Sequence, residues 1–223
     1  PLGTFGVNSG PMMAAVDEFD ITVKGKGGHA ASPHLAIDPV VISAQVISAV
    51  QTIISRSTDP VDKALISITK INAGTAYNVI DDQVKMGGTI RTFRRETRAY
   101  IEKRLNELCK GIADAHGAEI KIEFDLVNKY PPTINSKEET KFAANVAKDL
   151  VGDDKVITDI DPSMGGEDFS YLLEKKPGSY LYLGQGDAEH SAHLHTTKYD
   201  FNDNLLPIGV NFWVDLVQKY FSK

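Results

Sequence analysis

The stretch FDITVKGKGGHAASPH, residues 19–34, gives the first indication of the fold. Phe19, Ile21 and Val23 alternate with polar residues, a period typical of a strand with one buried face. The chain then runs through two glycines directly into His29. Glycine lets a backbone and a ligand approach closely, whereas a histidine kept for packing rarely needs glycines beside it. We therefore expect a strand that ends at a functional histidine; an exposed turn histidine is the alternative.

The elements that follow are predicted by the same reading of hydrophobic period. It predicts two helices and three further strands: helices Val40–Ile54, after Asp38-Pro39, and Ile101–Ala115, before Gly117, and strands around Ile66–Ile68, Val84–Thr92 and Ile120–Leu126. With the strand at residues 19–23, the order is βαββαβ. This order is typical of a ferredoxin-like arrangement, a four-stranded antiparallel sheet with two helices on one face.

The second half of the chain is less regular. Tyr130-Pro131-Pro132 marks a boundary, because proline interrupts both strand ladders and helices. Beyond it the pattern predicts two helices, a strand and two long polar loops: helices 137–150 and 205–220, strand 179–183, and loops 161–170 and 184–203. Loops of that length inside a compact chain are usually functional. The fold class expected for the whole chain is therefore α/β (α+β).

Charge and cysteine content exclude several classes of function. The net charge of −6 and the pI near 5.5 argue against nucleic-acid binding, which favours a basic face. No uninterrupted apolar run approaches the roughly 20 residues of a membrane span. Cys109 is the single cysteine, so a reducing, cytoplasmic location is expected. The start at Pro1 resembles neither an initiator methionine nor a signal peptide, so we expect a longer protein.

Three of the six histidines, His190, His193 and His195, lie in the segment HSAHLH. Neutral imidazole is a common metal ligand. On a strand, His193 and His195 would point the same way and could share one site. A solvated polar loop with incidental histidines explains the segment equally well, since an isolated HxH pattern is a weak signal.

Other candidates each have a structural alternative. Arg91, in a predicted strand, could bind a carboxylate through its planar fork or form a cross-strand salt bridge. Asn78 could face a ligand or cap a turn. Gly166 and Glu167 could lie at a site or at a helix entry, with Glu167 or Asp168 as the cap. Cys109 lies on an apolar helical stripe and is interpreted as packing.

Taken in order, the motifs resemble those of one family. The motifs that carry the resemblance are GPMMAAVDEFDITVKGKGGHAASPH, DP, GTAYNVI, GGTIRTF, MGGEDFSYLL and LHTTKYDFND. They resemble the binuclear-metal amidohydrolases and peptidases that include aminoacylases, carboxypeptidase G and succinyl-diaminopimelate desuccinylase. The hippurate hydrolases and the hydrolases of auxin–amino-acid conjugates are the most similar subgroup. The sequence departs from the family at Asp81 and Thr197, where the family usually has proline.

The resemblance implies a domain organisation. Residues 1–16 would be the tail of an N-terminal catalytic portion, 17–129 a ferredoxin-like lid and dimerisation domain, and 130–223 the C-terminal part of the α/β catalytic domain. The first catalytic portion, with most metal ligands and the general base, would precede Pro1. Two divalent ions (zinc, manganese, cobalt or nickel) are implied for the intact enzyme, and at most a partial metal site for this chain.

The resemblance also implies residue roles. His29 would reach a partner subunit's active site and stabilise the oxyanion, and His195 would be a metal ligand. Asn78 and Arg91 would contact the substrate, with Gly166 and Glu167 beside the site. The implied activity is hydrolysis of N-acyl-amino acids or related small amides by a homodimer joined through the lid, with this chain inactive alone. The alternatives are a non-catalytic dimerisation or binding module, and a dipeptidase or carboxypeptidase of the same family.

Overall fold

The computed structural model describes residues 1–125, 127 and 129–222, which divide into two compact units of mixed α/β structure. The first unit comprises Pro1–Met13, Thr133–Ser163 and Asp168–Lys223, and the second comprises Ala14–Pro132 and Met164–Glu167. The last of these segments was expected within the C-terminal catalytic portion. It clusters instead with the second unit.

The second unit is built on a four-stranded antiparallel sheet in the order β5-β7-β3-β8. Its principal elements are, in chain order, β3 (Ala15–Lys24), α1 (Pro39–Thr52), the π-helical turn η2 (Ile53–Ser57), β5 (Ala64–Asn72), β7 (Gln83–Thr92), α2 (Arg95–His116) and β8 (Glu119–Phe124). Apart from the turn η2, these are the six predicted elements, with bounds that differ by a few residues. Leu126, included in the predicted last strand, lies outside the described residues.

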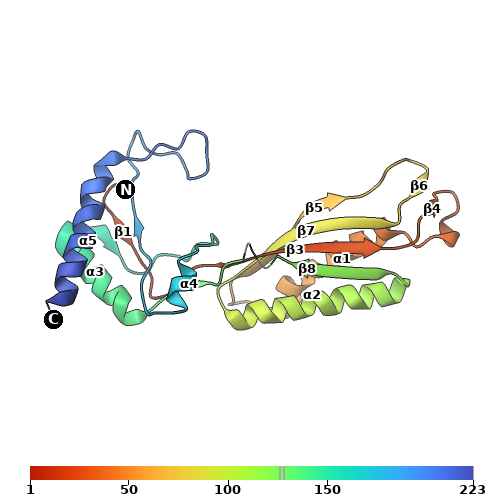
Figure 1. Cartoon of the computed structure of the whole chain (residues 1–223), viewed down its shortest axis with the longest axis horizontal. Coiled ribbons are helices and arrows are strands. Elements are labelled where there is room, and N and C mark those ends of the chain that lie inside the picture. Colours follow the sequence, from red (N-terminus) through yellow and green to blue (C-terminus); the bar gives the residue numbers. More distant parts are fainter. Residues whose placement is uncertain (126, 128, 223) are drawn as a thin grey trace. The chain divides into compact units, whose positions relative to one another are not determined.

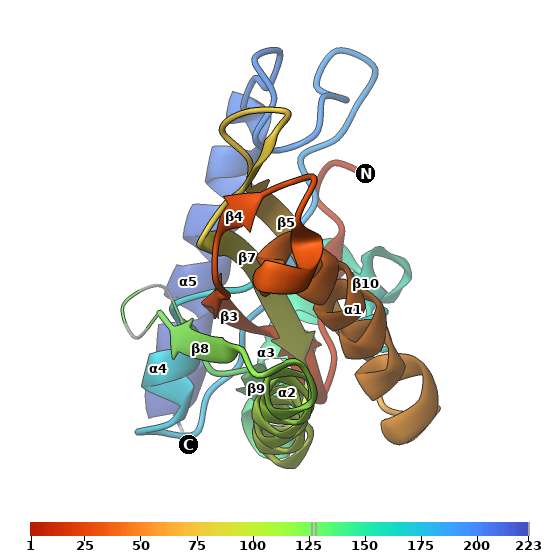
Figure 2. The same cartoon turned by 90° about the vertical axis from the view of Figure 1, so that its right-hand side faces the viewer.

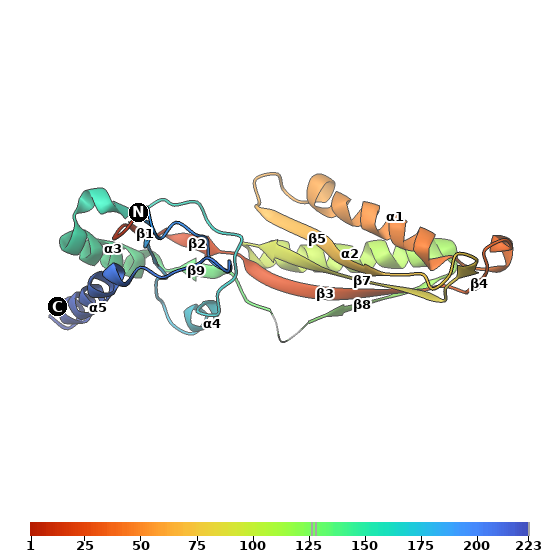
Figure 3. The same cartoon turned by 90° about the horizontal axis from the view of Figure 1, so that it is seen from above.

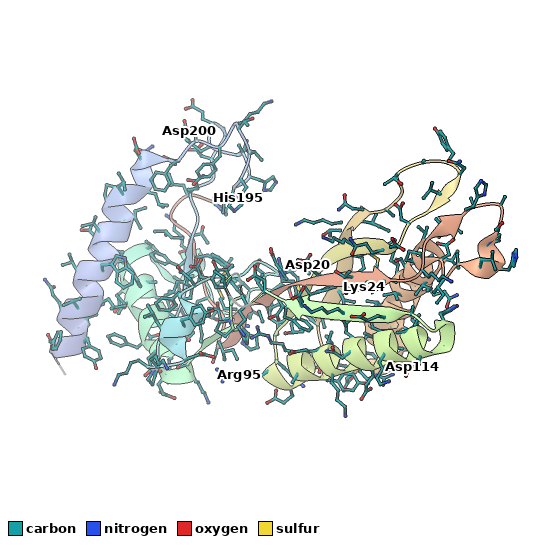
Figure 4. All side chains as sticks on the ribbon, turned by 45° about the vertical axis from the view of Figure 1, so that its right-hand side comes forward. Asp20, Lys24, Arg95, Asp114, His195 and Asp200 are labelled. Atoms are coloured by element: carbon teal, nitrogen blue, oxygen red, sulfur yellow. The ribbon has the colours of Figure 1, made fainter. Side chains whose placement is uncertain are left out.

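One face of this sheet packs against α1 and α2 (Figures 1 and 2). Phe19, Ile21 and Val23 are buried on that face, as their alternation predicted. The helices contribute seven buried residues to the same core: Ile42, Val46, Val50, Ile101, Leu105 and Cys109, with Ile53 from η2. The opposite face is open and polar, and Asp20 and Lys24 lie on it, away from α2 (Figure 4).

Both helices begin or end where the sequence predicted. The Asp38 carboxylate accepts a hydrogen bond from Val40 N at 2.8 Å, and Pro39 occupies the first turn of α1. At the end of α2, Gly117 is left-handed with φ 64°, a conformation that glycine adopts without steric cost. Local capping chemistry was therefore sufficient to place these two boundaries.

The helical segment Pro39–Ser57 has the length and apolarity of a membrane span, with a mean hydropathy of 1.3 over an 18-residue window. Its inward face supplies Ile42, Val46 and Val50 to the core of the second unit. Packing on the sheet requires these apolar residues and so explains part of the hydropathy, whereas Val40 and Val41 are exposed.

A small two-stranded antiparallel ribbon at one end of this sheet carries His29 (Figure 3). It pairs β4 (Gly28–His29) with β6 (Val79–Ile80). Two glycines before β4 are required by the chain's own backbone: a Cβ on Gly25 would lie 2.0 Å from Ile37 O, and one on Gly27 would lie 2.7 Å from Ile80 O. Gly27, one of the two glycines expected to allow close approach, therefore does so, but the group that approaches is the chain's own backbone. A Cβ on Gly28, the other, would meet only Ala36 Cβ, at 3.3 Å.

Replacing Gly25 with alanine should consequently lower the free energy of unfolding of the second unit by about 1–3 kcal/mol, the usual cost of overpacking. Gly111 is the matched control, because it lies exposed within α2 and a Cβ there would meet nothing within 4 Å. Gly111→Ala should stabilise the unit by about 0.5–1 kcal/mol through helix propensity. Chemical denaturation of both variants measures the two effects, and equal effects would contradict the steric explanation.

The first unit has smaller sheets and two long helices. Its principal elements are β1 (Phe5–Gly6), β2 (Gly10–Met13), β9 (Thr133–Asn135), α3 (Lys137–Val151), β10 (Val156–Ile157), α4 (Ser170–Leu173), β11 (Tyr182–Leu183) and α5 (Leu206–Phe221). Strand β1 is central in a three-stranded sheet with β10 and β11, and β2 pairs with β9. Phe5 and Val7 pack against α3 and Phe212 of α5.

The strand predicted over 179–183 is only partly correct, because β11 covers Tyr182–Leu183 alone. A buried side chain replaces a neighbouring strand at Tyr180. Asn135 Nδ2 donates to Tyr180 O at 2.9 Å, and Asn135 Oδ1 accepts from Tyr180 N at 2.7 Å. The backbone there is satisfied without a ladder, so apolar alternation alone overestimated the strand.

Candidate functional site

His29 and Asn78 are brought together by the antiparallel pairing of β4 with β6. His29 is directly opposite Val79 in the register, and Ala30 N donates to Asn78 O at 3.0 Å. Both side chains are exposed. His29 Nδ1 accepts a hydrogen bond from Ala31 N at 3.0 Å. A neutral imidazole held in this way carries its proton on Nε2, so the ring presents one outward N–H donor.

Arg91 lies on the open face of the sheet, in β7, and is half-buried. Its Nη1 donates to Ile90 O at 3.1 Å and to Thr89 Oγ1. Burial lowers the pKa of Arg91, and the nearby carboxylates of Glu18 and Asp17 oppose that shift. Among the described residues Arg91 forms no salt bridge, so the cross-strand alternative is not realised.

Arg91 contributes to a recess of about 230 Å³ on this open face. Both charge signs line it: two basic residues, Lys70 and Arg91, and three acidic ones, Glu18, Asp20 and Asp125. A site with this composition can bind a ligand that carries a carboxylate, or a zwitterion, through charge-assisted hydrogen bonds.

Gly166 and Glu167 belong to the short segment Met164–Glu167, which is part of the second unit. A Cβ on Gly166 would lie 2.1 Å from Val16 Cγ2, so glycine is required there for packing. The segment lies directly before α4, as the helix-entry alternative expected, but the N-cap residue of α4 is Phe169 and not Glu167 or Asp168. Glu167 is half-buried.

His195 lies in the other unit, on the loop Gly184–Asn202 between β11 and α5, with Asp200 on the same loop (Figure 4). The prediction that His193 and His195 share a strand face is wrong. The segment forms turns, with Thr196 Oγ1 donating to His193 O at 2.8 Å. His195 has a left-handed backbone with φ 62° and an exposed ring that makes no hydrogen bond or ion pair within the described chain.

The base of this loop contains a hydrogen-bond network that the sequence reading missed. Asp187 Oδ1 accepts from His190 N at 2.8 Å and from His190 Nδ1 at 2.9 Å. Asp187 Oδ2 accepts from Asn202 Nδ2 at 2.7 Å. The signal available in the sequence was the three-residue spacing of Asp187 and His190, since an aspartate often bonds the backbone two or three residues onward.

These contacts shift the pKa values of both Asp187 and His190. Hydrogen bonds from His190, backbone first and then side chain, lower the pKa of Asp187 to about 2. The hydrogen bond to Asp187 raises the pKa of His190, and Asp187, Asp200 and Glu189 add attraction that outweighs partial desolvation. Asp187 therefore remains ionised down to strongly acidic pH. The stabilisation from charged His190 is complete below its ordinary pKa of 6.5 and is lost as pH rises through the raised value.

An NMR titration should accordingly give His190 a pKa above 6.5. Asp187→Asn should return the pKa toward that value, because it removes the charged hydrogen-bond acceptor that raises it. Asp200→Asn is the matched control: its carboxylate is 3.9 Å from His190 Nε2, so the change should be smaller. A larger shift in the control would show that the network is assigned to the wrong partner.

Metal ligands do not cluster within residues 1–125, 127 and 129–222, where no group of three or more His, Cys, Asp or Glu side chains could hold an ion. Cys109 is also unsuited to chemistry. It is buried in the core of the second unit, and burial raises the pKa of its thiol to about 11. This agrees with its interpretation as packing.

Comparison with known proteins gives one consistent result. The model of peptidase family M20/M25/M40 matches residues 3–219. Hippurate hydrolase of Campylobacter jejuni is 38% identical over 218 residues, which are 98% of this chain and 56% of that protein. N-acetylcysteine deacetylase of Bacillus subtilis is 36% identical over 97% of this chain and 55% of that protein. The chain thus spans about half the length of the curated relatives it matches.

A solved structure of a dinuclear metal-binding peptidase of the M20 family from Bacillus subtilis is also similar. It superposes with a TM-score of 0.77 at 31% identity, over 97% of this chain and 52% of that one.

Proposed function

This chain belongs to peptidase family M20/M25/M40, and from that premise we propose that the whole protein hydrolyses the amide bond of N-acyl-amino acids or related small amides. The observation that carries the proposal is the similarity to hippurate hydrolase along 98% of the chain. Hippurate is an amino acid with an acyl group on its nitrogen, and N-acetylcysteine belongs to the same chemical class. The second relative therefore supports the same substrate class.

Two divalent metal ions, zinc, manganese, cobalt or nickel, are the proposed cofactors of the intact enzyme. The residues present fit one part of such a site: the His195 ring is exposed, and the described part of the chain offers it no competing hydrogen bond. The other ligands would come from outside this chain. When bound, such ions polarise an amide carbonyl and lower the pKa of a bound water.

The second unit would supply the groups that contact the substrate. His29 would donate a hydrogen bond from Nε2 to the oxyanion of the tetrahedral intermediate. The hydrogen bond from Ala31 N to His29 Nδ1 favours the tautomer that carries its proton on Nε2. Arg91 would bind the substrate carboxylate, since its guanidinium forms no ion pair in the described chain. Asn78 would act beside His29. Gly166 and Glu167 would lie at the edge of the site.

We assign the second unit the role of a ferredoxin-like lid and dimerisation domain. The sheet order β5-β7-β3-β8, with both helices packed on one face, supports this assignment. Strand β5 is an edge strand, and exposed apolar side chains lie at its end and on α1: Ile71, Val40 and Val41. An edge strand with neighbouring apolar surface can pair with a second copy of the same chain.

The first unit would be the C-terminal part of a larger catalytic domain. Helix α5 exposes large apolar residues at helical spacing along one face: Leu206, Val210, Trp213, Val214, Val217, Tyr220 and Phe221. Beside it, an apolar recess of about 240 Å³ is lined by Phe5, Tyr180 and Trp213, among others. A stripe of that extent usually packs against further protein, and the relatives are nearly twice as long as this chain.

The test is an activity assay of the intact protein, loaded with each of the four metals and compared with this chain alone. N-benzoylglycine, N-acetylcysteine and a dipeptide with a free amino group are the substrates, and released amino acid is the product measured. We expect cleavage of the acylated substrates by the intact protein and none by the isolated chain. Preferential cleavage of the dipeptide would favour the peptidase alternative, and inactivity on all three would contradict the proposal.

A further inference from the structure

The loop that carries His195 is closed at its base by buried polar side chains. Asn202 is fully buried and lies 15 residues after Asp187 and 17 after Gln185. Its Nδ2 donates to Gln185 O at 3.1 Å and to Asp187 Oδ2 at 2.7 Å, while its Oδ1 accepts from Asn204 N at 3.1 Å. Every polar atom of this buried amide is therefore used.

The other two side chains extend this closure to the rest of the loop. Gln185 Oε1 accepts from Asn202 N at 3.3 Å and from the Tyr199 hydroxyl at 3.2 Å. Asp187 Oδ1 accepts from Glu189 N at 2.9 Å and from His190 N. We call Gln185, Asp187 and Asn202 the loop clamp. It connects the first residues of the loop to its last ones and fixes turns on both sides of His195.

His195 itself requires such support. A left-handed backbone costs a residue with a Cβ about 1–2 kcal/mol, and persists only where surrounding structure over-determines it. The exposed His195 ring makes no bond in the described chain that could hold it. The bonds that hold this conformation are those of the loop, and the loop clamp supplies the ones that span its length.

We infer that Asn202 and Asp187 are positioning residues, which hold the loop so that the backbone of His195 keeps its left-handed conformation and its side chain starts from a fixed point. The position of His195 thus depends on two residues with which it forms no hydrogen bond or ion pair. The task of His195 as a metal ligand rests on the proposed function, but the positioning itself does not.

The test compares Asn202→Leu with Asn204→Leu in the 223-residue chain. Leucine has the same number of side-chain heavy atoms as asparagine, branched at the same carbon, and removes all three side-chain bonds at residue 202. Asn204 is exposed, and only its backbone takes part in the network. NMR relaxation should give the backbone N–H of His195 an order parameter near 0.85 in the wild-type chain and the control, falling below about 0.6 in Asn202→Leu. An unchanged order parameter in Asn202→Leu would overturn the inference.

Asp187→Asn covers the case in which Asn202→Leu fails to fold. It keeps the shape of residue 187 but sets an amide donor against Asn202 Nδ2, so His195 should again lose order. An order parameter at His195 that is unchanged in Asp187→Asn would show that the Asp187–Asn202 bond does not position the loop.

A second measurement separates this inference from the proposed function. In the intact protein, Asn202→Leu should weaken cobalt affinity about 10- to 100-fold, the usual effect of losing support behind a ligand, with Asn204→Leu unchanged. If His195→Ala leaves cobalt affinity unaltered, the proposed metal role fails while the order parameters still decide the positioning. If His195→Ala removes cobalt and Asn202→Leu does not, the positioning fails alone.

Discussion

Replacing His195 with alanine in the intact, metal-loaded protein is expected to lower kcat/KM by about a thousandfold or more. A metal ion supplies several kcal/mol of transition-state stabilisation, and each 1.36 kcal/mol corresponds to a tenfold change in rate. The exposed ring of His195 leaves the fold little dependent on it. Kinetics with an N-acyl-amino acid, metal analysis of the purified protein and circular dichroism measure the three consequences separately.

His193→Ala is the matched control for this prediction. His193 is also an exposed histidine, two residues away, and the loop uses only its carbonyl oxygen, which accepts from Thr196 Oγ1. Its removal should leave kcat/KM within a few fold of the wild type. Full activity and full metal content in His195→Ala would exclude a metal role for that residue.

Much of the second unit could be predicted because its determinants are local. The alternation of Phe19, Ile21 and Val23 specifies which face of β3 is buried, and all three lie in the core. Asp38 and Gly117 act within one turn of their own helix ends, through a side-chain bond and a left-handed φ respectively. Interactions between residues a few positions apart can be recognised from the residue types at those positions.

Interactions between distant residues could not be predicted in this way. Asp17 accepts a hydrogen bond from Arg98 Nε at 2.7 Å across 81 residues, and Asn135 takes the place of a strand partner for Tyr180. Neither pairing has a periodic pattern. The same holds for the site, where Ala31 N selects the His29 tautomer and Asn202 closes the His195 loop. Residue types could be named as candidates, whereas their partners required the structure.

The two glycines before His29 show how a correct observation can have a second cause. A ligand would require close approach at this turn, and so does the carbonyl of Ile80, 2.7 Å from the position of a Cβ on Gly27. Gly27 is therefore required by the path of the backbone itself, and the function of His29 must be tested by replacing its side chain.

Replacing His29 with alanine in the intact protein should lower kcat by about 100- to 1,000-fold, the usual effect of losing one oxyanion donor. KM should change little, because the interaction is made in the transition state. His34→Ala is the control: it is another exposed histidine, on the short helical turn Pro33–Leu35. A comparable loss in His34→Ala would indicate damage to the region around β4 and β6 and not loss of a hydrogen-bond donor.

Mixing two inactive variants tests whether His29 acts on the partner's site. If it does, a hybrid dimer of His29→Ala and His195→Ala has one site with both histidines intact and one site with neither. Random reassociation makes about half of the dimers hybrid, so the mixture should recover about a quarter of wild-type activity. If His29 acts within its own subunit, each site of the hybrid lacks one histidine and the mixture remains inactive. The two variants are unfolded and refolded together, and native mass spectrometry of the mixture shows whether hybrid dimers form. An inactive mixture that contains hybrid dimers would place His29 in its own subunit's site.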